Sequence, residues 1–117
     1  ERTYSTTGDI TYYDVGLGAC GYDDSAENDT GLFAAMSEEF WSSISTLTNA
    51  GSSLPSHPLC NKKVTLSAPD GTEVVVTVRE KCPGCAMEAI DVSKAAFKAL
   101  FGNLDIGRTK VSWSVSW

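Results

Sequence analysis

Hydrophobic and polar residues alternate along several short stretches of the chain, which is the pattern of β-strands that bury one face. The clearest case is residues 109–117, where valine and tryptophan alternate with lysine and serine. This alternation places Trp113 and Trp117 on the same face as the valines. We therefore expect a final strand whose tryptophans belong to the core rather than to a ligand site.

A β-hairpin is predicted in the middle of the chain. Residues 59–68 alternate between apolar and polar side chains, and residues 72–79 are nearly all valine and threonine. Between them stands an Asp-Gly pair at residues 70–71, which is typical of a two-residue hairpin turn. These features predict two adjacent antiparallel strands.

Two shorter strands and two helical segments are expected elsewhere. Residues 8–13 and 31–36 are rich in β-branched, aromatic or apolar side chains. Residues 37–41 read as a capped helical turn, and residues 93–101 read as a helix with Ser93 as its N-cap. Several short strands with one or two helices indicate a mainly β fold, either a small barrel or a sandwich.

The remaining segments are predicted to be loops. Residues 22–31 are acidic and show no periodicity, so we expect them to be exposed. Residues 49–58 are rich in Gly, Ser and Pro and contain the single histidine, His57, which we expect to be exposed. Trp41 is expected to pack against its own helical turn.

Length and charge narrow the classes of function. A chain of 117 residues forms one small domain, residues 1–117, and has no apolar run near the ~20 residues that span a bilayer. The formal net charge of −6 disfavours nucleic acid and anionic membranes, whose binding needs clustered Lys and Arg. We expect a soluble monomer, in mature form if it is exported, that needs no metal or cofactor, because no phosphate loop or histidine cluster is present.

The cysteines indicate an oxidising compartment, and hence a secreted protein. Cys20, Cys60, Cys82 and Cys85 lack the two close pairs of a four-cysteine zinc site, and the last two do not open a helix as a redox dithiol does. Two disulfides are the preferred interpretation. A sequon at Asn28 makes N-glycosylation a further expectation.

Five short motifs occur in the order found in fungal double-psi β-barrel proteins. They are Thr11-Tyr12-Tyr13, residues 18–22 (GACGY), 58–64 (PLCNKKV), 81–85 (KCPGC) and 90–93 (IDVS). In these motifs the chain resembles the single-domain, expansin-like loosenins and the related rare-lipoprotein-A-like and barwin-like proteins. The resemblance implies a six-stranded double-psi β-barrel with an open polysaccharide groove and no second carbohydrate-binding domain. It also implies that Cys20 pairs with Cys60, and Cys82 with Cys85.

The resemblance also implies the site. Asp91 matches the acid that is essential for wall loosening in expansins, Thr11 matches a first-strand threonine, and Glu80 matches a second acid. Expansins carry an aromatic residue two positions after that second acid, where this chain has Cys82. Strand alternation favours Tyr13 on the groove face with Thr11, and Tyr12 in the core. Tyr22, beside another motif, is a further candidate for sugar contact.

We therefore interpret the chain as a protein that loosens cellulose, chitin or a related cell-wall glycan without hydrolysis. One alternative is an inverting glycoside hydrolase, which needs two carboxylates; Asp91 would be its acid and Asp14 its base. Another is a barwin-like inhibitor of papain-type proteases. Simpler structural roles are helix capping for Asp91 and surface ion pairing for Glu80 with a neighbouring lysine or arginine.

Overall fold

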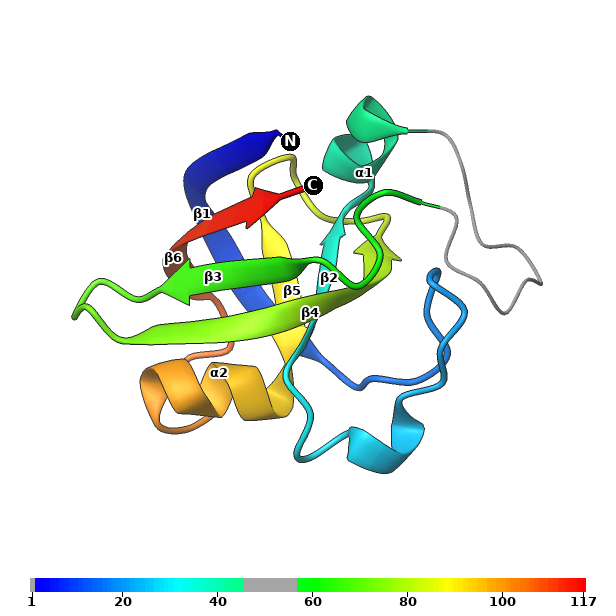
Figure 1. Ribbon diagram of the computed structural model, residues 1–117. Helices are drawn as coiled ribbons and strands as arrows, with labels where there is room; N and C mark the ends of the chain where they lie inside the picture. The colour runs from blue at the N-terminus through cyan, green and yellow to red at the C-terminus, as the bar shows by residue number, and fades with distance from the viewer. Residues whose placement is uncertain (1, 46–56) are drawn as a thin grey trace.

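The computed structural model describes residues 2–45 and 57–117, which form a six-stranded β-barrel with two short helices (Figure 1). The strands and helices are β1 (Thr3–Tyr13), β2 (Phe33–Ser37), α1 (Glu38–Ile44), β3 (Lys63–Ser67), β4 (Glu73–Cys82), β5 (Ile90–Ser93), α2 (Lys94–Phe101) and β6 (Thr109–Ser116), with a 3-10 turn at Ser25–Glu27. The barrel closes in the order β1-β5-β2-β4-β3-β6. The predicted mainly β, six-stranded double-psi barrel is therefore confirmed.

Parallel and antiparallel pairs alternate on one side of the barrel. Strand β1 pairs parallel with β5, β5 pairs antiparallel with β2, and β2 pairs parallel with β4. These four strands bring together four segments that are far apart in the sequence. The two remaining strands, β3 and β6, complete the barrel through antiparallel pairs. None of the helices in the described part of the chain has the length and apolar character to cross a membrane.

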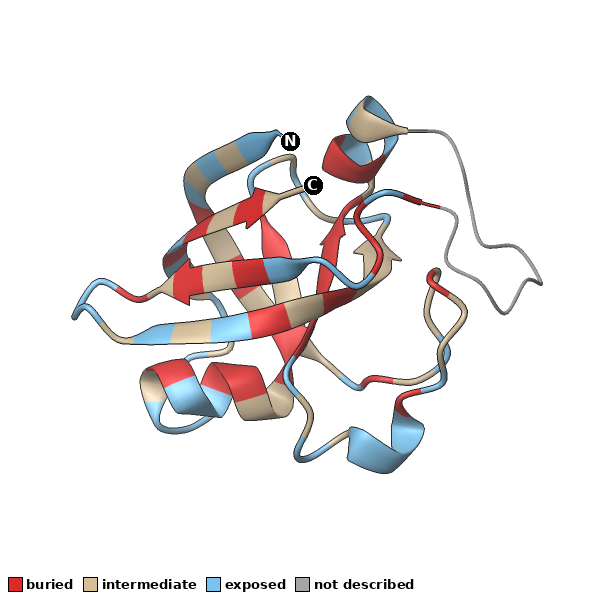
Figure 2. Cartoon of the chain, in the orientation of Figure 1, coloured by how far each residue is buried: buried red, intermediate tan, exposed pale blue. Residues whose placement is uncertain are grey.

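The barrel interior is filled by alternate residues of the strands, as the sequence pattern predicts. Val111, Trp113 and Val115 of β6 are buried, and so are Val64 and Leu66 of β3. Figure 2 shows buried residues alternating with exposed or intermediate ones along β1, β3 and β6. Burial of large aliphatic and aromatic side chains, each worth about 1.5–3 kcal/mol, is the main stabilising contribution in a domain of this size.

Helix α2 covers the barrel with an apolar stripe of Ala96, Phe97 and Leu100. The ring of Tyr12 packs on Phe97 with centroids 5.0 Å apart, which confirms Tyr12 as a core-side residue. The helix ends at Gly102, whose φ of 85° lies in the left-handed region that favours glycine.

Two local predictions need correction. The hairpin between β3 and β4 is present, but its turn is longer than two residues: Ala68 N–H donates to Thr72 O, and Gly71 has a φ of 92°. This is a three-residue loop with a left-handed glycine. Ser93 occupies the N-cap position of α2, as predicted, but its side chain makes no capping bond, because its hydroxyl donates to Gly31 O and accepts from Phe33 N–H. The serine instead fixes the start of β2.

His57 is buried rather than exposed, which is a third correction. Its ring stacks on Trp41 with centroids 3.9 Å apart, and only 3% of its surface is exposed. Nε2 lies 2.8 Å from Trp41 O, and Nδ1 accepts a hydrogen bond from Leu59 N–H. Since Nδ1 must accept, the ring is neutral with its proton on Nε2. Trp41 therefore packs against a loop distant in sequence as well as its own helix.

The burial of His57 leads to a prediction about stability. Desolvation lowers the pKa of the imidazole below its ordinary value of 6.5. The stability that the neutral ring provides is therefore present above pH 6.5 and is lost as pH falls toward the lowered pKa. We expect His57→Ala to reduce the free energy of unfolding by about 2–3 kcal/mol at pH 7, and by less at pH 5. Urea unfolding of both proteins at the two pH values measures this; an equal loss at both would contradict it.

Candidate functional site

One row of paired residues crosses four neighbouring strands and brings the main predicted site residues together. Thr11 of β1 pairs with Asp91 of β5, Asp91 pairs with Ala35 of β2, and Ala35 pairs with Glu80 of β4. Residues paired across strands point to the same face of a sheet, so these four side chains share the outer face. We call this set the Asp91 row. The small Ala35 separates the two acids.

Asp91 lies at the centre of the row. Its neighbours Ile90 and Val92 are fully buried in the barrel, which fixes the backbone and directs the carboxyl to the opposite face. The carboxylate accepts a hydrogen bond of 2.9 Å from the Thr11 hydroxyl. Partial burial raises the pKa of Asp91, while the Thr11 bond and the charge of Arg108 act against that shift. The carboxyl therefore takes up a proton more readily than an ordinary aspartate.

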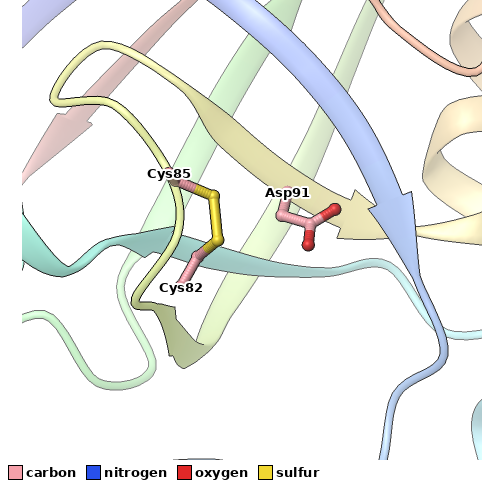
Figure 3. A group of neighbouring side chains, drawn as sticks. All are labelled: Cys82, Cys85 and Asp91. Carbon is pink, nitrogen blue, oxygen red and sulfur yellow. A yellow bond between two sulfur atoms is a disulfide. The ribbon is translucent and has the colours of Figure 1, made fainter.

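The Cys82–Cys85 disulfide stands beside the Asp91 carboxyl, as Figure 3 shows. The two sulfur atoms and a carboxylate oxygen all lie within 4.8 Å of one another. Three such side chains resemble a set of metal ligands, but sulfur atoms joined in a disulfide carry no thiolate to bind an ion. The disulfide instead holds the turn after β4 against the site. Next to this turn is a small hollow of about 70 Å³ that includes Thr11, Cys85 and Arg108 in its lining.

Glu80 binds backbone groups rather than a surface cation, so its expected ion pair with a neighbouring lysine or arginine is absent among the described residues. Oε1 accepts hydrogen bonds from Ala19 N–H at 2.7 Å and Lys81 N–H at 3.0 Å. Gly18, the residue before Ala19, packs so closely on β4 that a Cβ there would lie 2.4 Å from Arg79 O. Glu80 therefore holds the glycine-rich loop against the barrel from its position in the Asp91 row.

Tyr13 lies on the same face of β1 as Thr11, as strand alternation predicts. Burial raises the pKa of its phenol, and the negative charges of Glu80, Asp91 and Asp24 raise it further. The phenol therefore remains protonated at all ordinary pH values. Its hydroxyl can therefore act as a hydrogen-bond donor.

Asp24 and Arg79 were not predicted from the sequence, and Asp24 corrects the expectation that residues 22–31 are exposed. Only 6% of the Asp24 surface is exposed, and its carboxylate lies 3.4 Å from Arg79 Nε. Burial raises the pKa of Asp24, and Arg79 opposes that shift. The sequence signal was limited to an arginine that follows a valine-rich stretch, directly before Glu80.

Tyr22 is partly covered by this arginine. The Arg79 guanidinium carbon lies 4.2 Å from the centroid of the Tyr22 ring, which is a cation–π contact. The Tyr22 hydroxyl accepts a hydrogen bond from Asn61 Nδ2 at 3.0 Å. One face of the ring is thus occupied within the protein, so a sugar could stack only on the other.

Asp14 and Asn28 hold the segment that follows β1. The Asp14 carboxylate lies 2.6 Å from Lys94 Nζ and accepts a hydrogen bond from Asn28 Nδ2. Both bonds lower the pKa of Asp14, which makes it a weaker base. The other end of the Asn28 amide accepts from Val15 N–H at 2.8 Å. The asparagine of the sequon therefore has a structural role in the loop.

The four cysteines form the two disulfides that the family resemblance implied. Cys20 is bonded to Cys60 and Cys82 to Cys85. No cysteine is free, and all four lie in the described part of the chain. The first bridge joins the glycine-rich loop to the segment before β3, and both of its cysteines are buried.

Comparison with solved structures first gives the class of protein. The expansin of Clavibacter michiganensis, solved in complex with cellohexaose, superposes with a TM-score of 0.71 at 24% identity, over 97% of this chain and 51% of that one. This likeness places the chain among the double-psi β-barrel proteins. No protein-family model matches the chain.

A second structure gives the family. The Streptomyces papain inhibitor superposes with a TM-score of 0.76 at 34% identity, over 97% of this chain and 96% of that chain. The chain belongs to the family of this inhibitor.

Two curated relatives agree with this assignment. The papain inhibitor of Streptomyces mobaraensis is 36% identical over 95 residues, and an Arthroderma benhamiae protein named Allergen Asp f 7 homolog is 33% identical over 94. The matched parts span 59% and 28% of those two proteins.

Proposed function

We propose that this protein is secreted, binds structural cell-wall polysaccharide such as cellulose or chitin at the Asp91 row, and loosens it without cutting glycosidic bonds. The observation that carries the proposal is the Asp91 carboxyl, half-buried on the outer face of the barrel and bonded to Thr11. An expansin of the same fold has been solved with a bound glucan, which supports a sugar polymer as the ligand.

The chemistry of the row suits competition for hydrogen bonds. A carboxyl with a raised pKa exchanges between a form that only accepts and a form that also donates. Tyr13 supplies a hydroxyl that stays protonated, and Glu80 supplies a second carboxylate. Sugar hydroxyls that bond to these groups release their bonds to neighbouring chains. Loosening then follows from binding alone and needs no cofactor.

Hydrolysis is less well supported by the geometry. Cleavage needs one carboxyl as acid and a second as base or nucleophile, roughly 5–9.5 Å apart. Asp14, the candidate base, is bound to Lys94 and Asn28, and its pKa is lowered. Glu80 uses one carboxylate oxygen to hold two backbone N–H groups. Neither acid is arranged to activate water beside Asp91.

Inhibition of papain-type proteases is a second candidate function. It is favoured by one observation, the 34% identity to the Streptomyces papain inhibitor over nearly the full length of both chains. The two functions make different demands on the surface, since an inhibitor must fill a protease cleft whereas a loosening protein must engage an extended polymer.

A direct comparison of the two activities tests the proposal. We expect the protein to reduce the tensile strength of cellulose paper or chitin film without releasing soluble sugars, and to leave papain activity unchanged at equimolar concentration. Release of reducing ends would instead support the hydrolase. Papain inhibition without any effect on either polymer would replace the proposed function with the second candidate.

A further inference from the structure

A second face of the barrel, distinct from the Asp91 row, carries a regular array of hydroxyl groups. On β1 and β6 the outward positions form three directly opposed pairs: Thr3 with Ser116, Ser5 with Ser114, and Thr7 with Ser112. On the other side of β6, Ser114 pairs with Thr65 of β3, and Ser112 pairs with Ser67. These eight residues form what we call the hydroxyl face, and Figure 1 shows their three strands side by side.

The hydroxyl face is free of charged side chains. Its eight positions are all Ser or Thr, in a chain of which 21% is charged. Charged residues begin only at its border, where Ser67 pairs with Glu73 of β4 and Lys110 follows at one end. Protein surfaces ordinarily carry charged side chains of both signs interspersed, so a face of eight uncharged hydroxyl residues departs from a simple solvated face.

The surface is also hollowed along the strands. A depression of about 390 Å³ is lined by Ser5, Thr7 and Ser112 among others. A second depression, of about 350 Å³, shares Thr7, Ser112 and Ser67 with the first. Because the two share these residues, they form one shallow trough across β1, β6 and β3.

The hydroxyls are arranged to bind a polar ligand. Thr3 is bonded to Ser116 and Thr7 to Ser112, each pair at 2.8 Å, which fixes the side chains. A hydroxyl can donate one hydrogen bond and accept two, so each bonded pair keeps one free donor and three free acceptor positions. Sheet geometry spaces the groups about 4.8 Å apart across strands and about 6.7 Å along them. Lys110 lines the second depression at one end, and the Ser67 hydroxyl donates to the Glu73 carboxylate at 3.2 Å. Between these two borders the trough offers a repeating, uncharged set of donors and acceptors.

We propose that the hydroxyl face is an adsorption site for an extended, uncharged polysaccharide chain. The ligand is uncharged because the face offers no counter-ion, and it is rich in hydroxyls because the face presents both donors and acceptors. This inference rests on the proposed function for the kind of polymer. It adds a second contact surface for the polymer to the Asp91 row, where the polymer is bound and loosened.

The two surfaces are joined by β1. Its outward positions run from the hydroxyl face through Asp9 to Thr11, and Thr7 and Thr11 are four positions apart along the strand, about 13 Å. Between them the charge of Asp9 is compensated by Lys110 at 2.6 Å and Arg108 at 3.1 Å. One polymer chain following β1 can thus contact both surfaces without meeting an unpaired charge.

Removal of the central hydroxyls tests the proposal. The variant Ser5→Ala, Thr7→Val, Ser112→Ala and Ser114→Ala keeps strand-compatible residues while losing four hydroxyls. Its adsorption to insoluble cellulose and chitin is expected to weaken by about fivefold or more. Binding of the native protein is expected to be equally strong with and without 0.5 M NaCl, since no ion pair is involved. The matched control, Ser42→Ala with Thr77→Val, lies outside the trough and should adsorb as the native protein does.

Two further measurements decide the result. Asp91→Asn provides the comparison: adsorption that falls in this variant but not in the four-site variant would assign binding to the Asp91 row alone and overturn the proposal. Adsorption of the four-site variant equal to the native would overturn it as well. So would a native dimer that the variant converts to a monomer, because the face would then be a contact between copies. If no polymer is weakened but adsorption still follows the hydroxyls, the proposed function fails and this inference survives.

Discussion

Replacing Asp91 by Asn is expected to reduce the weakening of cellulose or chitin by roughly tenfold, because losing one hydrogen bond to the polymer, worth about 1.4 kcal/mol, changes binding tenfold. The amide keeps the size of the side chain and can still accept the bond that Thr11 donates. What it loses is the exchange between carboxylate and carboxylic acid. Tensile tests on polymer films measure the effect. If the Asn variant weakened the films as much as the native protein does, Asp91 would have no part in the mechanism.

The Asp91→Asn substitution is also expected to change how polymer weakening depends on pH. Because burial raises the pKa of Asp91, weakening by the native protein should increase as pH falls from 7 through that raised value, and the Asn variant should lack this dependence. In the folded state the carboxyl binds its proton more tightly than in the unfolded chain, whose ordinary value is 3.8. The folded protein therefore loses stability as pH rises from 3.8 through the raised pKa.

Stability and function should therefore move in opposite directions at Asp91. The Asn variant is expected to melt at a higher temperature than the native protein at pH 7, and at a similar temperature near pH 4. Asp9→Asn is the matched control. It is expected to lower the melting temperature at pH 7, because bonds from Lys110 and Arg108 lower the pKa of Asp9. A lower melting temperature for the Asp91 variant at pH 7 would contradict the interpretation of this carboxyl.

Removal of the Cys20–Cys60 disulfide is expected to have the largest effect on stability. The bridge spans a separation of 40 residues, and the chain-entropy model then assigns it about 4 kcal/mol. For a domain of 117 residues this corresponds to a fall in melting temperature of roughly 15 °C. The double variant Cys20→Ser with Cys60→Ser, followed by calorimetry, measures the loss.

The second disulfide provides the comparison. Cys82 and Cys85 are only three residues apart, so the same model assigns this bridge about 2 kcal/mol. Its position beside Asp91 suggests a different consequence, a larger loss of polymer weakening than of stability. If both double variants lost equal stability, the entropic account of the longer bridge would be wrong.

Local features of the fold could be predicted from the sequence because they depend on neighbouring residues. Alternation along β6 and the apolar stripe of α2 follow directly from the periods of strand and helix. Contacts between segments that are distant in the sequence could not be predicted in this way. The stacking of His57 on Trp41 joins residues 16 positions apart, and no local pattern distinguishes a buried loop histidine from an exposed one.

The candidate site likewise contains some residues that could be predicted from the sequence and others that could not. Asp91 and Thr11 were found through motifs, and the register of β1 and β5 places them side by side. The use of Glu80 to hold Ala19, and the burial of Asp24 against Arg79, depend on how the glycine-rich loop folds back on β4. The hydroxyl face was present in the sequence as alternate serines and threonines, but the adjacency of its three strands comes only from barrel closure.

The way the barrel closes determines where an attached segment would emerge. Arg2 and Trp117 exchange two backbone hydrogen bonds of 2.9 Å, so the first and last strands are tied together at one rim. Thr3 at this rim and Thr11 are eight residues apart along β1, a distance of about 26 Å. A fluorescent tag or fused module on either end would thus lie next to Ser116 and leave Asp91 unobstructed. The length of its linker could then be chosen to cover the hydroxyl face without covering the Asp91 row.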